Sequence, residues 1–132
     1  MPTNTRLRVI FKCIHPDKTF DDIMIDLTDT SGPLHEGSIF ADKMSDEAAL
    51  GNLLPYGHRW NPGNGEYCRV TYWKDKASND AFTAELNSTP AMHKFYDNLT
   101  ANGYTYEVVK AEVEVDEIFE IPGTTGPFPI VE

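Results

Sequence analysis

The sequence predicts an α+β protein whose elements follow the order strand, helix, strand, strand, helix, strand. Three observations support this order. Residues 6–15, and the long run that begins at residue 104, alternate apolar and polar side chains, as half-buried strands do. A strand–turn–strand pattern fills residues 56–73, and an apolar stripe at helical spacing runs through residues 76–101. Four strands in this βαββαβ order form an antiparallel sheet that carries its helices on one face.

The first strand, residues 6–15, has one apolar face, formed by Leu7, Val9, Phe11 and Cys13. Its other face mixes basic residues with isoleucine, so we expect that face to be partly covered too.

The two cysteines of the chain each lie in an apolar, strand-like run, which is typical of a small buried thiol. A disulfide between them stays open, because sequence does not give their distance.

Residues 19–27 fit two interpretations. Thr19 could be the N-cap of a short helix with acidic residues in its first turn. The same stretch could be a strand, because Ile23, Ile25 and Leu27 alternate. A second short helix is predicted for residues 45–54, which begin with a serine and carry leucines on one side.

The hairpin is predicted from its turn. Residues 56–60 form a short strand, residues 61–65 (NPGNG) the turn, and residues 66–73 the return strand. Two glycines and two asparagines in the turn supply the positive-φ positions that a tight reversal needs.

Residues 76–101 are predicted to be helical with one break. Ser78 is the expected N-cap, and Pro90 fits the first turn of a second helical piece. Gly103 is the expected stop. After the last strand, residues 119–132 form an irregular, proline-rich tail.

Charge and length limit the classes of function. The chain has 132 residues and a net charge of −10, and its eleven basic residues are scattered. Nucleic acids and anionic membranes need clustered Lys and Arg, so neither is an expected partner. No apolar run approaches the roughly 18 residues of a membrane span, and no apolar leader precedes the first charges. We therefore expect a cytoplasmic protein with one domain, residues 1–132.

Motifs for metals and cofactors are not evident in the sequence. No histidine pair has the spacing of a zinc site, and no Cys-x₂-Cys is present, so no metal is expected. The chain also shows no nucleophile elbow, phosphate-binding glycine loop or dinucleotide-binding fingerprint, so no bound cofactor is expected.

An aromatic strand ending in Tyr72 and Trp73 leads into a helical segment with Phe82 and Leu86, and then into the run STPAMHKF, residues 88–95. In these residues, and in the approach to the hairpin and the final alternating strand, the chain resembles the dimeric α/β-barrel superfamily. That superfamily includes antibiotic-biosynthesis monooxygenases and EthD-like proteins. The resemblance covers about residues 55–118, and residues 16–54 are longer than the single helix it implies, so we expect an insertion there.

The resemblance implies a ferredoxin-like fold. It also implies a homodimer in which two four-stranded sheets pack face to face as a dimeric α/β barrel. Members usually keep a small-molecule pocket between each sheet and its own helices. An enzyme of this kind would act on a small apolar or aromatic metabolite without a cofactor, as a monooxygenase, cyclase, isomerase or lyase. The alternatives are a non-catalytic binding protein that uses the same pocket and a structural dimer without a ligand.

Histidine is the best general base near neutral pH, so the candidate catalytic residues are His93 and His58. Candidates for substrate binding are the remaining aromatic and basic residues near strand ends and on the aromatic strand: His15, Trp60, Arg69, Tyr72 and Trp73. Tyr72 and Trp73 must point to opposite faces of their strand. Because the face with Cys68, Val70 and Tyr72 is smaller and more apolar, we expect it to meet the core. Arg69 and Trp73 would then face the partner sheet or a polar pocket.

Overall fold

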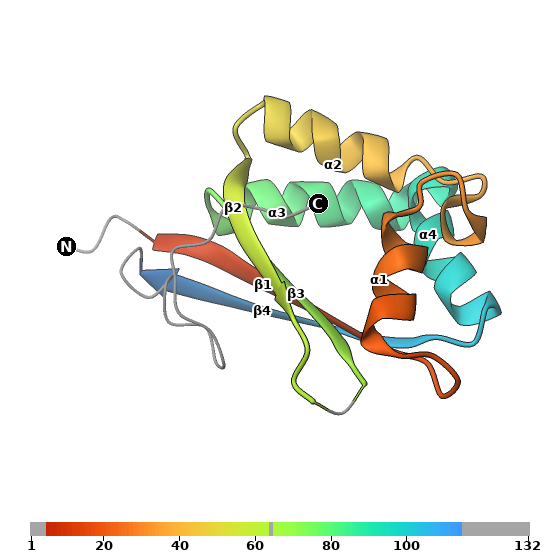
Figure 1. Cartoon of the computed structure of the whole chain (residues 1–132). Helices are drawn as coiled ribbons and strands as arrows, with labels where there is room; N and C mark the ends of the chain where they lie inside the picture. Colours follow the sequence, from red (N-terminus) through yellow and green to blue (C-terminus); the bar gives the residue numbers. More distant parts are fainter. Residues whose placement is uncertain (1–4, 64, 115–132) are drawn as a thin grey trace.

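The computed structural model describes residues 5–63 and 65–114. Its strands form one sheet in the order β2-β3-β1-β4, and every neighbouring pair is antiparallel. The described part of the chain is therefore α+β with the predicted βαββαβ order (Figure 1). The elements are β1 (Thr5–Ile14), α1 (Phe20–Thr28), the short 3₁₀ helix η1 (Pro33–His35), α2 (Phe40–Ala49), β2 (Leu53–Trp60), β3 (Tyr67–Trp73), α3 (Lys76–Ser88), α4 (Pro90–Ala101) and β4 (Thr105–Glu114).

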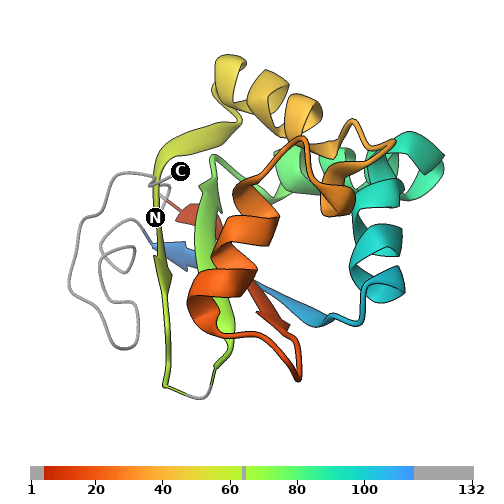
Figure 2. The same cartoon turned by 45° about the vertical axis from the view of Figure 1, so that its right-hand side comes forward.

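All four α-helices pack against the same face of the sheet, and the sheet of one chain is open rather than a closed barrel (Figure 2). The register places Leu7 opposite Trp73 and Cys13 opposite Tyr67, so these four side chains share the face toward the helices. The apolar face predicted for the first strand is thus confirmed. The opposite face, which we call the helix-free face, carries the alternate residues of each strand.

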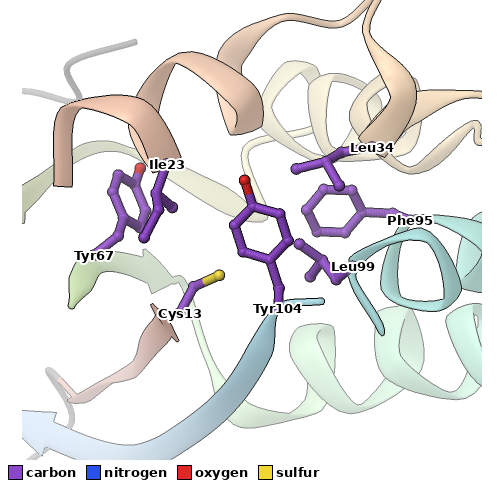
Figure 3. Close-up of a cluster of buried hydrophobic side chains, with 7 residues drawn as sticks. All are labelled: Cys13, Ile23, Leu34, Tyr67, Phe95, Leu99 and Tyr104. Carbon is purple, nitrogen blue, oxygen red and sulfur yellow. The ribbon is translucent and has the colours of Figure 1, made fainter. Parts of the chain in front are cut away.

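Two buried clusters fill the space between the sheet and the helices. Figure 3 shows the first cluster, in which Ile23 of α1 lies beside Tyr67, and Phe95 lies beside Leu34 on the other side of Tyr104. The second cluster centres on Trp73, whose ring centroid lies 5.1 Å from that of Phe82 in α3. Hydrophobic burial at these positions provides the main favourable term that holds the helices on the sheet.

The helical interpretation of residues 19–27 is correct. The hydroxyl of Thr19 accepts a hydrogen bond from the Asp22 N–H at 3.3 Å, and the Asp22 carboxylate accepts one from the Thr19 N–H at 3.1 Å. This reciprocal capping box satisfies two N–H groups that a strand would have to pair elsewhere. The alternation that favoured a strand places Ile23 in the core and leaves Ile25 61% exposed.

The predicted helix at residues 45–54 is misplaced. α2 begins five residues earlier, at Phe40, so Ser45 lies inside the helix rather than at its N-cap. Leu53 belongs to β2 and pairs with Trp73 across the ladder. Gly51, at φ 81°, provides the positive-φ residue between the helix and the strand. Residues 16–54 therefore hold α1, η1 and α2, more than the single helix of the βαββαβ plan.

The break predicted between α3 and α4 is present, and Pro90 occupies the first turn of α4. The expected N-cap of α3 is wrong. Asp75 holds that position, and its carboxylate accepts a hydrogen bond from the Ser78 N–H at 2.8 Å. Gly103 follows α4 at φ 88°, and a Cβ there would lie 3.0 Å from Nε2 of His15, so both backbone and space require glycine.

The hairpin is confirmed, with β2 and β3 paired and Trp60 opposite Cys68. The ladder contains a register shift between Leu53 and Gly57, so β2 is irregular at its start.

The tail expected at residues 119–132 lies outside the described residues. None of the described helices is long and apolar enough to cross a membrane.

Candidate functional site

Three of the predicted site residues share the helix-free face of the sheet. His58 and Trp60 lie two residues apart on β2, and the register places them opposite Val70 and Cys68 of β3. Tyr72 follows Val70 by two residues and therefore shares their face. The sheet thus brings a histidine, a tryptophan and a tyrosine to one surface.

The rings of His58 and Trp60 lie parallel. Their centroids are 6.3 Å apart and their planes differ by 4°. His58 is half-buried, and this burial, with the charge of Arg59 as a second cause, lowers the pKa of its imidazole. A histidine with a lowered pKa is neutral at neutral pH and able to accept a proton.

An apolar cluster surrounds this pair on the helix-free face. Val70 and Tyr72 are 0% and 1% exposed, and Val113 of β4 completes the buried part of the cluster. Partly buried apolar residues pack against it: Ile10, Leu54, Trp60 and Ala111. The buried cluster supports His58 and Trp60, which are themselves partly exposed, and a parallel aromatic pair with a neutral base is suited to a flat apolar or aromatic molecule.

Arg8 adds a positive charge to the same face and was not among the predicted site residues. It lies opposite Tyr72 on one side and Ala111 on the other. Its Nε atom is buried and has no hydrogen-bond partner among the described residues. The alternation of β1 places Arg8 on the face opposite Leu7 and Val9, but it does not show that the Nε atom of Arg8 is buried.

The prediction that Arg69 and Trp73 face away from the helices, toward the partner sheet, is wrong. Trp73 is 2% exposed and packs against the α3 ring of Phe82, so it faces the chain's own helices. Arg69 shares that side, opposite Phe11. The inference failed because β3 is a central strand with buried residues on both faces, so the size of its side chains does not show which face meets the helices.

His93 lies apart from His58. It belongs to α4, which packs on the other face of the sheet, and its Nδ1 lies 3.0 Å from the carboxylate of Asp97 one turn on. The His93 side chain is 42% exposed, and its ring lies 5.9 Å from that of Tyr96. The two predicted bases therefore do not form one site.

His15 is held by backbone groups at the end of β1. Its Nδ1 accepts a hydrogen bond from the Asp17 N–H at 3.0 Å, which leaves Nε2 to donate to the Asn102 carbonyl at 3.1 Å. Its ring packs edge-on against Tyr104, with centroids 4.9 Å apart. These contacts tie the end of β1 to the turn before β4.

A polar cluster beside His15 was not predicted from the sequence. The hydroxyl of Tyr104 donates a hydrogen bond to the carboxylate of Asp26, and the Lys18 ammonium lies 2.8 Å from the same carboxylate. Burial acts to raise the pKa of Asp26, but the hydrogen bonds from Lys18 and Tyr104 outweigh it and lower that pKa. No short-range signal could reveal the pair, because Asp26 lies in α1 and Tyr104 directly precedes β4.

Aromatic side chains fill the space between sheet and helices, where the resemblance implied a pocket. Phe40 of α2 stacks on Phe95 with centroids 5.0 Å apart, and also contacts Tyr96 and Phe82. The hollows recorded among the described residues are open and lie elsewhere. One of about 270 Å³ lies beside η1, and one of about 170 Å³ lies between the end of β1 and the start of β4. Among residues 5–63 and 65–114, no three His, Cys, Asp or Glu side chains gather as a metal site would require.

The chain is similar in structure to a dimeric ferredoxin-like protein from an uncultured marine organism. The TM-score is 0.55, with 18% sequence identity over 83% of this chain and 95% of that chain. A conserved protein of unknown function from Bacteroides thetaiotaomicron, described as a possible oxidoreductase, gives a TM-score of 0.45 at 8% identity, over 84% of this chain and 100% of the other. No family model and no curated protein matches the sequence. The first likeness establishes the class of fold, which is ferredoxin-like α+β.

Proposed function

We propose that the protein is a homodimer that binds a small apolar or aromatic molecule on the helix-free face and acts on it, with His58 as general base. The observation that carries this proposal is the parallel stack of His58 on Trp60, beside Tyr72 and with the pKa of the imidazole lowered. The dimeric state of the structurally similar ferredoxin-like protein supports a second copy of the chain.

The chemistry starts from a neutral imidazole. His58 would remove an acidic proton from an activated phenol or enol that lies against the partly exposed rings of His58 and Trp60. The resulting oxyanion needs a hydrogen-bond donor or a positive charge, and Arg8 is a cation on this face. A second sheet over the face would exclude water and strengthen these interactions. The reaction class is proton abstraction, followed by oxygenation, cyclisation, isomerisation or elimination, without a bound cofactor.

A non-catalytic binding protein is the second candidate. His93 and His58 lie on opposite faces of the sheet, so the proposed site holds one of the two predicted catalytic histidines. A site with fewer catalytic groups favours binding without catalysis. Replacing His58 with alanine separates the two candidates, because an enzyme loses turnover, whereas a binding protein has no turnover to lose and changes only in affinity.

Native mass spectrometry of the purified protein tests the dimer and the ligand together. The expected result is twice the chain mass with a small organic molecule retained at gentle activation. A monomer without added mass under all gentle conditions would contradict both parts of the proposal.

The location of the site is tested by fluorescence. In a Trp73→Phe background, Trp60 is the remaining tryptophan of the chain. Phenyl-naphthylamine, a neutral aromatic probe, should quench Trp60 by energy transfer and bind more weakly after His58→Ala. Tyr106→Ala is the matched control, because Tyr106 is 39% exposed and lies opposite Cys13, on the side toward the helices. Equal weakening by the two alanine substitutions would contradict a site on the helix-free face.

A further inference from the structure

We propose that the natural ligand carries an anionic group, such as a carboxylate, and that the Arg8 guanidinium binds it. This inference rests on the proposed function, because it places the ligand's aromatic part near His58 and Trp60. It adds the charge of the ligand and names the residue that would recognise that charge.

Arg8 has no acidic residue among its register neighbours. Its register neighbours, Tyr72 and Ala111, carry no charge, and no ion pair of Arg8 is found within the described part of the chain. Its Nε atom, like that of Arg6, is shielded from solvent without a hydrogen-bond acceptor among the described residues, so the lack of a nearby acidic group is what distinguishes Arg8. A buried, unsatisfied donor is costly, and a bound anion would remove that cost.

The other basic residues on this face of β1 have different neighbours. Arg6 donates a hydrogen bond to the Thr5 carbonyl at 2.9 Å. The hydrogen bonds from Ser78 lower the pKa of Asp75, and the charge of Arg6 is a minor further cause of the same shift. Lys12 lies opposite Glu107 in the ladder. Arg8 is therefore the cation on this face whose own neighbours supply no negative charge.

The distance from Arg8 to the aromatic pair suits a ligand of about two rings. His58 lies opposite Val70, and Val70 lies opposite Ile10, two residues from Arg8. At about 4.8 Å between strands and about 3.4 Å per residue, the two Cα atoms are about 12 Å apart. An extended arginine side chain covers part of that distance, so a two-ring acid can contact both the guanidinium and the stacked rings.

An anionic ligand needs a positive charge close to its binding site on this protein. The chain has a net charge of −10, so its overall field disfavours an anion. A planar guanidinium can bind a carboxylate or sulfonate through two parallel hydrogen bonds, and such charge-assisted pairs are stronger than neutral ones.

Two probes with the same rings test the proposal. Anilinonaphthalene sulfonate carries a sulfonate, whereas phenyl-naphthylamine has the same rings without it. Both are titrated against the full chain in the Trp73→Phe background, with energy transfer from Trp60 as the signal. Arg8→Gln should weaken sulfonate binding by about 10-fold or more and change binding of the neutral probe by less than about 2-fold.

Two further variants make the result specific. Lys110→Gln removes one positive charge from the opposite side of the sheet, since Lys110 pairs with Val9 and donates to the Thr83 hydroxyl at 2.9 Å. It should leave sulfonate binding within about 2-fold of the parent, and Arg8→Lys should retain part of the affinity. Thermal unfolding of each variant confirms that it is folded.

The outcomes distinguish the two proposals. Equal loss of both probes in Arg8→Gln, or equal loss of the sulfonate in Lys110→Gln, overturns the role of Arg8 and leaves the proposed site standing. Absence of Trp60-dependent binding for both probes overturns the proposed site, and the role of Arg8 with it.

Discussion

The hydroxyl of Tyr104 donates a hydrogen bond to the carboxylate of Asp26, although 78 residues separate them in the chain. Tyr104 is 4% exposed and belongs to the first buried cluster, so this contact joins the core to the outer side of α1. The Lys18 ammonium lies over the same tyrosine ring, 6.0 Å from its centroid. The start of β4 is therefore connected to α1 by a specific polar contact as well as by apolar packing.

Tyr104→Phe should lower the free energy of unfolding. Phenylalanine keeps the ring and removes the hydroxyl that donates to Asp26, and hydrogen bonds to charged groups contribute about 1.5–3 kcal/mol. Urea denaturation of both proteins measures the difference. Tyr106→Phe is the matched control, expected within about 0.5 kcal/mol of the parent because Tyr106 is 39% exposed. Similar losses for both variants would contradict a specific role of the Tyr104 hydroxyl.

Asp26 should make stability depend on acidic pH. Its pKa in the folded state is below the ordinary value of 3.8, so its contribution is present above that value and is lost as the pH falls through the folded pKa. The free energy of unfolding of the parent should therefore fall between about pH 5 and pH 3. Asp26→Asn should be less stable at pH 7 and show a shallower decline across this range. An identical slope in the two proteins would contradict the assignment.

His58 should titrate below the ordinary histidine range. Burial, followed by the charge of Arg59, lowers its pKa from the ordinary value of 6.5. The folded state then binds fewer protons than the unfolded state as the pH falls through 6.5, so this contribution to stability is present at higher pH and is lost on acidification. Imidazole NMR resonances followed from pH 8 to pH 5, and assigned with His58→Gln, measure the pKa. A midpoint at or above 6.5 would show that His58 is not the neutral base proposed here.

Both thiols should be unreactive in the folded protein. Cys13 lies on the helix side and Cys68 on the helix-free side, so they cannot form a disulfide in this sheet. Burial, with the nearby charge of Glu66, raises the pKa of Cys13 to about 12 and that of Cys68 to about 11. A chromogenic disulfide reagent should react slowly with the native chain and release two equivalents after denaturation. Fast native release would contradict the burial, and fewer equivalents after denaturation would indicate a disulfide.

Local sequence signals predicted most of the fold. The alternation of β1 and β4, the turn of the hairpin and Pro90 at the start of α4 reflect short-range requirements of backbone and burial, and the structure shows each of them. The prediction of the N-cap of α3 failed because two residues could fill that position. Asp75 and Ser78 are both good N-caps, and the choice between them depends on where the chain leaves β3.

The candidate site was only partly predictable. The period of two along a strand placed His58 and Trp60 on one face, but which face meets the helices depends on contacts with residues far along the chain. Arg8 was overlooked because basic residues on a strand usually face solvent. Its buried Nε becomes evident only when Tyr72 and Ala111 are seen on either side of it.

The irregular start of β2 affects how copies of the chain can meet. β2 is an outer strand, and Pro55 within it has no N–H to offer to a strand from another molecule. The register shift between Leu53 and Gly57 also breaks the repeat that a growing intermolecular ladder would need. At the opposite margin, β4 exposes charged residues such as Lys110 and Glu112. Within the part of the chain that the structure describes, both margins of the sheet therefore disfavour the addition of strands from other molecules.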